Sequence, residues 1–154
     1  MLSNACKYAI RSILYLAINS SEDNKIGVKI IAEELETPQP FLAKLLQQLT
    51  RDKLVSSTKG PNGGFYLNEK NLNNAVWDVI ISIDGTDKFD NCFLGLAKCD
   101  DRNPCPVHFI VSPFKEKILG SFRDKTIEEY VVEIQNTNRV ISLKDLDLFE
   151  DEGS

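Results

Sequence analysis

Residues 37–67, TPQPFLAKLLQQLTRDKLVSSTKGPNGGFYL, decide the fold. Thr37 followed by Pro38 is a helix start signal, because a threonine side chain can cap the first turn and proline is tolerated at the first helical position. The apolar residues after it recur at helical spacing: Phe41, Leu42, Leu45, Leu46 and Leu49. We therefore predict a helix that begins at Pro38 and ends near Asp52.

A β-hairpin is predicted directly after this helix. Residues 54–58 (LVSST) and 64–67 (GFYL) have the composition of short strands. Gly60, Pro61 and Asn62 lie between them, and they supply the positive and the fixed φ angles that a tight reversal of the chain requires. The predicted hairpin is therefore short, with a glycine-rich tip.

Three more helices are predicted around this unit, at residues 2–19, 28–35 and 73–83, from apolar residues at helical spacing. Gly27 stands at the N-cap of the helix 28–35, and Gly85 ends the last of the three. A short helix, a turn, a helix with a polar free face and a glycine-rich hairpin follow one another in the order of a winged helix-turn-helix. The predicted fold class is therefore mainly α with a small β-hairpin wing.

The polar residues of this unit are candidates for contacts with double-stranded DNA. The free face of the central helix carries amides, cations and one proline that can approach base edges in the major groove: Gln39, Pro40, Lys44, Gln47, Gln48 and Arg51. The hairpin tip can run beside the phosphate backbone through Lys59, Gly60, Asn62 and Gly63. Any one of these residues alone is more typical of a solvated surface, but the helix and the hairpin together favour DNA binding.

The composition indicates an ordinary globular protein and limits its partners. The chain has 154 residues, of which 42% are apolar and 27% charged, which suffices for one domain with its own core. Neither an apolar run of membrane-spanning length nor a secretory signal occurs, so we expect a cytoplasmic protein without membrane contact. The net charge is −5, but residues 25–70 carry seven Lys/Arg and five Asp/Glu, whereas residues 89–154 carry eight and thirteen. The acidity therefore lies away from the predicted recognition helix and hairpin.

Three of the four cysteines lie close together, followed by the single histidine: Cys92, Cys99, Cys105 and His108. Residues 87–106 contain several Gly, Pro, Asp and Asn, so we predict a loop that can wrap these side chains around one centre. Thiolates and imidazole suit an iron–sulfur cluster or zinc. The gaps of six, five and two residues favour the cluster slightly, because structural zinc sites usually contain a tighter cysteine pair.

Other features surround this candidate metal site. A disulfide is unfavourable in the expected reducing compartment. Apolar residues that can form a shell around a cluster stand nearby, at Phe89, Phe93, Leu94, Leu96 and Phe109. Cys6, which lies alone on the first predicted helix, is expected to be a small core residue.

The C-terminal part contains a candidate dimerisation helix. An apolar stripe recurs every three or four residues at Val107, Val111, Phe114, Ile118 and Phe122. Either a second subunit or the chain's own domain can cover this stripe, and Pro113 either starts or kinks the helix. Thr126 and Glu129 form a capping box that opens a closing helix over residues 127–134. The acidic residues 137–154 are expected to form a mobile tail.

In combination these features resemble the IscR/NsrR-type family of bacterial winged-helix transcriptional regulators, in its iron–sulfur sensing branch. The resemblance extends over residues 2–132. It is carried by KYAIR at 7–11, LYLA at 14–17, IAE at 31–33, FL at 41–42, KGPNGGF at 59–65 and CPVH at 105–108. The glycine-rich hairpin together with the three-cysteine loop is its most specific part.

The resemblance implies a homodimeric repressor that binds a pseudo-palindromic DNA operator and holds one 2Fe–2S cluster in each subunit. Cys92, Cys99 and Cys105 match the three cysteine ligands of the family, and His108 matches the fourth ligand of some members. Other members take an acidic ligand from the first helix of the partner, but Lys7 stands at that position here. The chain then divides into a DNA-binding domain, a cluster-binding loop, a dimerisation helix with a closing helix, and the tail: residues 1–86, 87–106, 107–136 and 137–154.

An enzyme is the rival class, and the sequence argues against it. We find neither a nucleotide-binding fingerprint nor a paired catalytic constellation, and the only histidine belongs to the cysteine group. A nucleophile pair of Cys105 and His108 is conceivable, but it leaves the hairpin and the polar helix face unexplained. We therefore expect no catalysis and no small-molecule substrate. The alternative to a cluster sensor is a zinc-stabilised or cluster-free DNA-binding protein.

Overall fold

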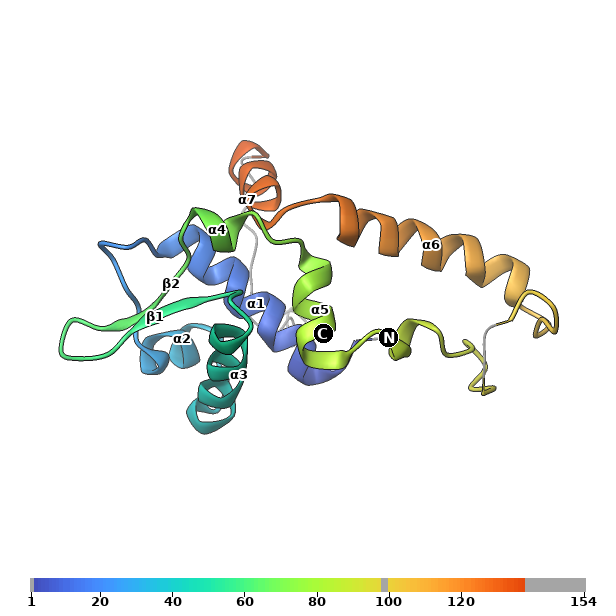
Figure 1. Ribbon diagram of the computed structural model, residues 1–154, viewed down its shortest axis with the longest axis horizontal. Coiled ribbons are helices and arrows are strands. Elements are labelled where there is room, and N and C mark those ends of the chain that lie inside the picture. Colours follow the sequence, from blue (N-terminus) through green and yellow to red (C-terminus); the bar gives the residue numbers. More distant parts are fainter. Residues whose placement is uncertain (1, 98–99, 138–154) are drawn as a thin grey trace, which may run out of the picture.

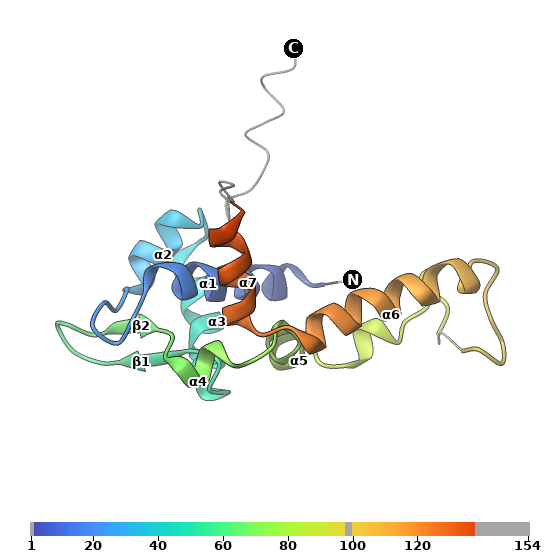
Figure 2. The same ribbon diagram turned by 90° about the horizontal axis from the view of Figure 1, so that it is seen from above.

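The computed structural model describes residues 2–97 and 100–137, which form helices and one two-stranded hairpin. Along the chain the elements are α1 (Asn4–Asn19), α2 (Val28–Glu34), α3 (Gln39–Arg51), β1 (Ser56–Thr58), β2 (Gly64–Tyr66), α4 (Glu69–Leu72), α5 (Val76–Asp84), a 3-10 turn (Asp87–Phe89), α6 (His108–Asp124) and α7 (Ile127–Asn136). Figure 1 shows that α1 to α5, the hairpin and α7 form a body, from which α6 extends as an arm. In the view of Figure 2 the segment between α5 and α6 again lies beside this arm.

The core of the body lies between α1, α2 and α3. Leu42, Leu46 and Leu49 of α3 are fully buried, and they pack in one cluster with Ile13 and Leu16 of α1. Burial of one leucine side chain stabilises a fold by about 1.5–3 kcal/mol. This main core therefore holds α3 firmly by one face and leaves the opposite face free.

Most helix boundaries agree with the prediction to within two residues, and α1 begins at Asn4, two residues later than predicted. α3 begins at Gln39 with Pro38 as its N-cap, and the buried Thr37 donates its hydroxyl to the Leu35 carbonyl oxygen at 3.1 Å. The predicted cap at Thr37 is therefore wrong by one residue. α5 begins at Val76, three residues later than predicted, and the short helix α4 before it was not predicted.

The antiparallel hairpin lies against the segment that precedes α2. Ile26 and Phe65 exchange two backbone hydrogen bonds, of 2.9 Å from the Ile26 N–H and 2.8 Å from the Phe65 N–H. Gly64 has a φ of +150°, and a Cβ on it would stand 2.9 Å from the Ile26 backbone. Glycine at this position therefore allows the hairpin to lie this close to the body.

The C-terminal half of α6 packs on the body. Leu119 and Phe122 pack against a second core cluster that contains Cys6 and Phe89. Cys6 is fully buried, so it is a core residue as predicted. The arm is thus anchored at one end, while its other end extends away from the body (Figure 1).

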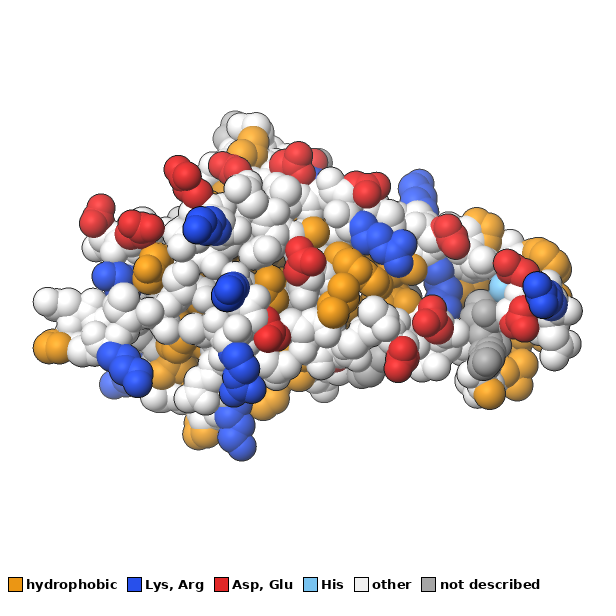
Figure 3. All heavy atoms as spheres, in the orientation of Figure 1, with side chains coloured by type: hydrophobic (Ala, Val, Ile, Leu, Met, Phe, Trp, Pro, Cys, Tyr) orange, Lys and Arg blue, Asp and Glu red, His pale blue; other side chains and the backbone are white. Residues whose placement is uncertain are grey.

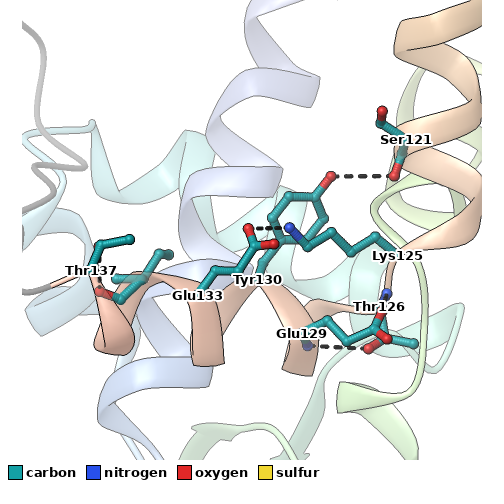
Figure 4. Close-up of polar contacts among 8 residues, drawn as sticks. Ser121, Lys125, Thr126, Glu129, Tyr130, Glu133 and Thr137 are labelled. Atoms are coloured by element: carbon teal, nitrogen blue, oxygen red, sulfur yellow. Dashed lines mark hydrogen bonds and ion pairs between the residues drawn. The ribbon is translucent and has the colours of Figure 1, made fainter.

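α7 returns the chain to the body after the arm. α6 begins at His108 and runs through Pro113, which excludes the alternative that this proline starts the helix. The predicted capping box opens α7: Thr126 Oγ1 accepts from the Glu129 N–H at 3.2 Å, and the Glu129 carboxylate accepts from the Thr126 N–H at 2.7 Å (Figure 4). Ile127, the first residue of α7, is fully buried in the main core.

Two predictions lie largely outside the described chain. The acidic tail is outside the described residues apart from Thr137, and the candidate ligand Cys99 is outside them too. Within residues 2–97 and 100–137, no helix has the length and apolarity that crossing a bilayer requires.

Candidate functional site

The polar face of α3 is exposed on the body. Five of the six residues predicted to contact DNA from this helix are exposed: Gln39, Pro40, Lys44, Gln47 and Arg51. Lys44, Gln47 and Arg51 lie opposite the buried leucines, so the helix can approach a groove without losing core contacts. Its N-terminal end points away from the rest of the body (Figure 1), which is how a recognition helix enters a major groove.

The tip of the hairpin projects from the same body. Lys59, Gly60 and Asn62 are exposed there. Gly63 is half-buried, and a Cβ on it would stand 2.3 Å from the Thr58 carbonyl oxygen. Gly63 is therefore needed to close the hairpin, and Lys59 is the cation of the tip.

Basic side chains gather near α3 and the hairpin. In Figure 3 Lys and Arg side chains lie along the lower edge of the molecule, over α3 and the hairpin, and Asp and Glu side chains dominate the upper edge. This separation agrees with the sequence, in which residues 25–70 carry a local excess of Lys/Arg. A surface of this sign attracts a phosphate backbone even though the whole chain is acidic.

Gln48 is the exception among the predicted DNA contacts of α3. It is half-buried, and its Nε2 donates to the Ser82 carbonyl oxygen of α5 at 2.6 Å. The sequence contains the signal, because Gln48 follows the buried Leu45 by three residues and so borders the buried side of the helix. The structure places Gln48 against α5 and not among the exposed residues.

The cysteine loop brings two thiols together. Cys92 is only 5% exposed, and the Cys105 side chain donates a hydrogen bond to its sulfur. A tight turn follows Cys92, closed by a 2.9 Å bond from the Gly95 N–H to the Cys92 carbonyl oxygen. The backbone N–H groups of Leu94 and Leu96 also donate to the Cys92 sulfur. Cys92 is therefore surrounded by hydrogen-bond donors.

These donors lower the pKa of the Cys92 thiol below its usual value. The hydrogen bond from the Leu94 N–H is the largest cause, and burial acts against it. The Leu96 N–H, the Cys105 side chain and the charge of Lys115 lower the pKa further. The thiolate is the form that binds a metal, so the surroundings of Cys92 suit it as a ligand.

His108 is another buried group of this region, with 3% of its surface exposed. Its Nε2 lies 2.6 Å from Asp101 Oδ1, and its ring meets Phe109 edge-on with 5.3 Å between the centroids. Its backbone N–H donates to the Cys105 carbonyl oxygen at 3.0 Å. A carboxylate on one ring nitrogen is the usual second partner of a metal-bound histidine.

The structure brings together two of the four predicted ligands, Cys92 and Cys105. Cys99 lies outside the described residues. Among the residues that are described, no three His, Cys, Asp or Glu side chains form a group that could hold a metal ion. His108 follows Cys105 by three residues but does not complete such a group within the described part.

The predicted apolar shell divides into one buried and four exposed residues. Phe89 is buried and packs on Trp77 of α5, with 5.6 Å between the ring centroids. The other four are exposed: Phe93, Leu94, Leu96 and Phe109. Phe89 thus belongs to the core of the body, and the rest form an apolar surface at the free end of the arm, where Figure 3 shows hydrophobic side chains at the right.

The predicted dimer stripe also divides along α6. Phe122 packs on the body, Phe114 is 61% exposed, and three residues are half-buried: Val107, Val111 and Ile118. Ile110, which lies beside the stripe and was not predicted, is 77% exposed. A cleft of about 620 Å³ lies here, lined by Asn91, Cys92, Phe93, Ile110, Val111, Phe114 and Lys115. The uncovered apolar surface is therefore at the N-terminal half of α6.

Known proteins with similar sequences are regulators of transcription. The model of the Rrf2 family, described as an iron-dependent transcriptional regulator, matches residues 2–133. A protein of Aquifex aeolicus (strain VF5) that carries the name of an HTH-type transcriptional regulator is 34% identical over 133 residues, which cover 85% of this chain and 91% of that protein. The HTH-type transcriptional regulator IscR of Klebsiella pneumoniae (strain 342) is 28% identical over 130 residues, covering 84% and 78%.

Two solved structures share the fold. CymR (YrzC), the global cysteine regulator of B. subtilis, superposes with a TM-score of 0.69 at 19% identity, covering 86% of this chain and 97% of that one. T. potens IscR superposes with a TM-score of 0.66 at 20% identity, covering 92% and 93%. The predicted fold class is thereby confirmed.

Proposed function

The chain belongs to the Rrf2 family of transcriptional regulators, and we propose that it is a homodimeric repressor whose affinity for a DNA operator depends on a 2Fe–2S cluster in the cysteine loop. Membership of a family of regulators also agrees with the prediction that the chain is not an enzyme. The observation that carries the proposal is the Cys92 sulfur, which accepts hydrogen bonds from two backbone N–H groups and from Cys105. Cys92 and the exposed polar face of α3 belong to the same subunit.

The DNA-binding half of the proposal rests on α3 and the hairpin. The exposed side chains of α3 meet base edges and phosphates in the major groove: Gln39, Lys44, Gln47 and Arg51. The backbone can come close to DNA at Pro40 in the first turn of α3 and at Gly60 and Asn62 in the hairpin tip. Lys59 of the tip meets a phosphate. Gly63 contributes by closing the hairpin.

The homodimer is proposed from the uncovered apolar surface of the arm. Phe93, Ile110 and Phe114 are exposed and line one cleft. Contiguous apolar surfaces of this kind mark protein–protein contacts. A second copy, related by a two-fold axis, would cover the surface with its own arm. The two α3 helices would then address operator half-sites about one helical turn apart, ~34 Å.

The residues of the loop fit a 2Fe–2S cluster by the chemistry of their donors. The thiolates of Cys92, Cys99 and Cys105 would hold it, together with the imidazole of His108. When bound, such a cluster supplies a centre whose oxidation state and integrity respond to iron supply and oxidants. The N–H groups that donate to the Cys92 sulfur favour its thiolate form, which is the form that binds a metal, and Asp101 orients the His108 ring. Three cysteines and a histidine also suit zinc, which the test below distinguishes.

Regulation follows from the connections of the loop. The loop leaves the body at the end of α5, and α6 returns the chain to it (Figure 1). A change in the order of the loop therefore alters how α6 and the second copy hold the two bodies, and the spacing of the two α3 helices no longer matches the half-sites. Linkage requires that DNA binding in turn alters the preference of the loop for its bound state.

Anaerobic purification followed by iron, acid-labile sulfide and zinc analysis tests the proposal. We expect iron and sulfide in equal amounts, with visible absorption that is lost in Cys92→Ala and in Cys99→Ala. Cys6→Ala is the control, and it should keep the absorption because Cys6 is buried in the body. Zinc without sulfide would contradict the cluster, and a single-subunit mass in solution would contradict the homodimer.

A further inference from the structure

The last turn of α5 is hydrogen-bonded to two other helices of the body. Ser82 contacts α3 twice: its carbonyl oxygen accepts from Gln48 Nε2 at 2.6 Å, and its hydroxyl donates to Asp52 Oδ2 at 2.5 Å. Asp84 contacts the start of α1, where its carboxylate accepts from the Ser3 N–H at 2.8 Å and from the Ser3 hydroxyl. This turn therefore joins the C-terminal end of α3 to the N-terminal end of α1.

The same turn leads directly into the cysteine loop. The 3-10 turn Asp87–Phe89 follows it, three residues before Cys92. Phe89 packs on Trp77 of α5, and the Arg123 guanidinium of α6 lies 4.6 Å from the centroid of the same tryptophan ring. The start of the loop and α6 thus both contact Trp77, which lies on the same helix as Ser82.

The contacts of Ser82 are directional, unlike the packing of the leucines. A hydrogen bond to a carboxylate or carbonyl weakens steeply when its distance or angle changes, whereas apolar packing tolerates small displacements. A shift of the last turn of α5 would therefore release or rotate the C-terminal end of α3. The buried leucines would keep the helix attached to the body during that change.

We propose that Gln48, Ser82 and Asp52 form the connection by which the state of the cysteine loop changes the position of α3. The proposal rests on the proposed function and names the route of its regulation. Gln48 is then a positioning residue that acts through α5 and does not read a base. Substitutions along such a route change the coupling between two sites by on the order of 2- to 30-fold.

The test measures the ratio of the operator dissociation constants of cluster-loaded and cluster-free protein for each variant. The probe is one DNA duplex that the wild-type protein selects from a pool of random sequences. Ser82→Ala removes the bond to Asp52, Gln48→Ala removes the bond to the Ser82 carbonyl, and Ser82→Thr keeps a hydroxyl. Thr50→Ala is the matched control on α3, because the Thr50 hydroxyl donates to the Leu46 carbonyl of its own helix at 2.7 Å. Visible absorption and far-UV circular dichroism establish that each variant is loaded and folded.

We expect the ratio to fall at least about threefold in Ser82→Ala and in Gln48→Ala, and to keep its wild-type value in Ser82→Thr and Thr50→Ala. A ratio unchanged in both alanine variants of the route would overturn this inference alone. A changed base preference of Gln48→Ala at an unchanged ratio would overturn it too, since Gln48 would then read DNA. Equal affinities of the two wild-type forms would instead overturn the proposed function, and this inference with it.

Discussion

Replacing Gly64 by alanine is expected to strain the hairpin or detach it from the body. The added Cβ would stand 2.9 Å from the carbonyl carbon and oxygen of Ile26 and 3.0 Å from its nitrogen, where ordinary contacts lie at 3.4–4 Å. These atoms belong to the backbone, so no side chain can rotate aside to make room. The φ of +150° is in addition unfavourable for alanine.

The protein can either accept a strained alanine at position 64 or move the hairpin away from Ile26, and the less costly of these two responses sets the loss of unfolding free energy. Strain at an unfavourable backbone conformation costs about 1–3 kcal/mol. Moving the hairpin away instead breaks the two bonds between Ile26 and Phe65, each worth about 1 kcal/mol, and withdraws the Phe65 ring from the main core. We therefore expect the free energy of unfolding to fall by about 2–3 kcal/mol.

Urea unfolding followed by far-UV circular dichroism measures this loss. Gly27→Ala is the matched control, because its φ is −72° and an added Cβ meets no atom within 4 Å. Gly27 is the N-cap of α2, where alanine is less favourable than glycine, so this control should lose less than about 1 kcal/mol of unfolding free energy. If Gly64→Ala unfolds at the same urea concentration as the wild type, the close approach of the hairpin to Ile26 does not stabilise the fold, and the reasoning is refuted.

Three further predictions concern the hairpin tip, α7 and alkaline pH. Lys59→Ala should reduce the slope of log affinity for operator DNA against log salt concentration by about one unit, because one phosphate contact is lost. Lys117→Ala, at an exposed position on α6, should leave the slope unchanged. Equal slopes for the two variants would argue against a phosphate contact of Lys59. Thr126→Ala should lower the free energy of unfolding by about 1 kcal/mol, because it removes the hydroxyl that caps α7, and urea unfolding at wild-type stability would contradict this. Burial, with a smaller effect of Glu34, raises the pKa of Tyr15 above its usual 10.0, so the folded state binds this proton more tightly than the unfolded chain does. The stabilisation from protonated Tyr15 is therefore full below pH 10 and is lost as the pH rises through the folded pKa. Over that range the unfolding free energy of Tyr15→Phe should fall less than that of the wild type, and equal falls would contradict a raised pKa of Tyr15.

The sequence predicts the elements whose signals are local. The leucines of α3 recur at helical spacing, and four of the five predicted apolar residues are buried, with Phe41 exposed at the edge. The capping box of Thr126 and Glu129 identifies the start of α7, and the glycines of the hairpin identify its tip. Each of these signals is local in the sequence, so it can be predicted without knowledge of distant contacts.

Predictions fail where distant or very short interactions decide the outcome. Gln48 is a residue type that can contact DNA, and its spacing from Leu45 indicates only that it borders the buried side of α3. Its partner Ser82 lies on another helix, and the spacing does not identify that partner. α4 has four residues, and its capping box of Asn68 and Asn71 is hard to distinguish from a turn in the sequence. Thr37 has the right residue type for a cap, but its hydroxyl bonds backward to Leu35 instead.

The dimer stripe shows that the spacing of apolar residues does not predict which of them stay exposed. Phe114 and Phe122 are equivalent by spacing, yet Phe122 packs on the body and Phe114 is exposed. The difference depends on where α6 leaves the body, which the spacing of apolar residues does not contain. The ligand set stays a prediction, because Cys99 lies outside the described residues and the pair of Cys92 and Cys105 is the part that the structure brings together.

Regulation by the cysteine loop requires that the state of the loop changes the affinity for DNA, and operator affinity measures that coupling directly. The measurement is fluorescence anisotropy of the selected duplex with anaerobically purified protein, before and after its iron and sulfide are removed. We expect the two dissociation constants to differ by at least about fivefold, the lower end of typical coupling between sites. Identical constants for a preparation with full iron and sulfide content would contradict the account.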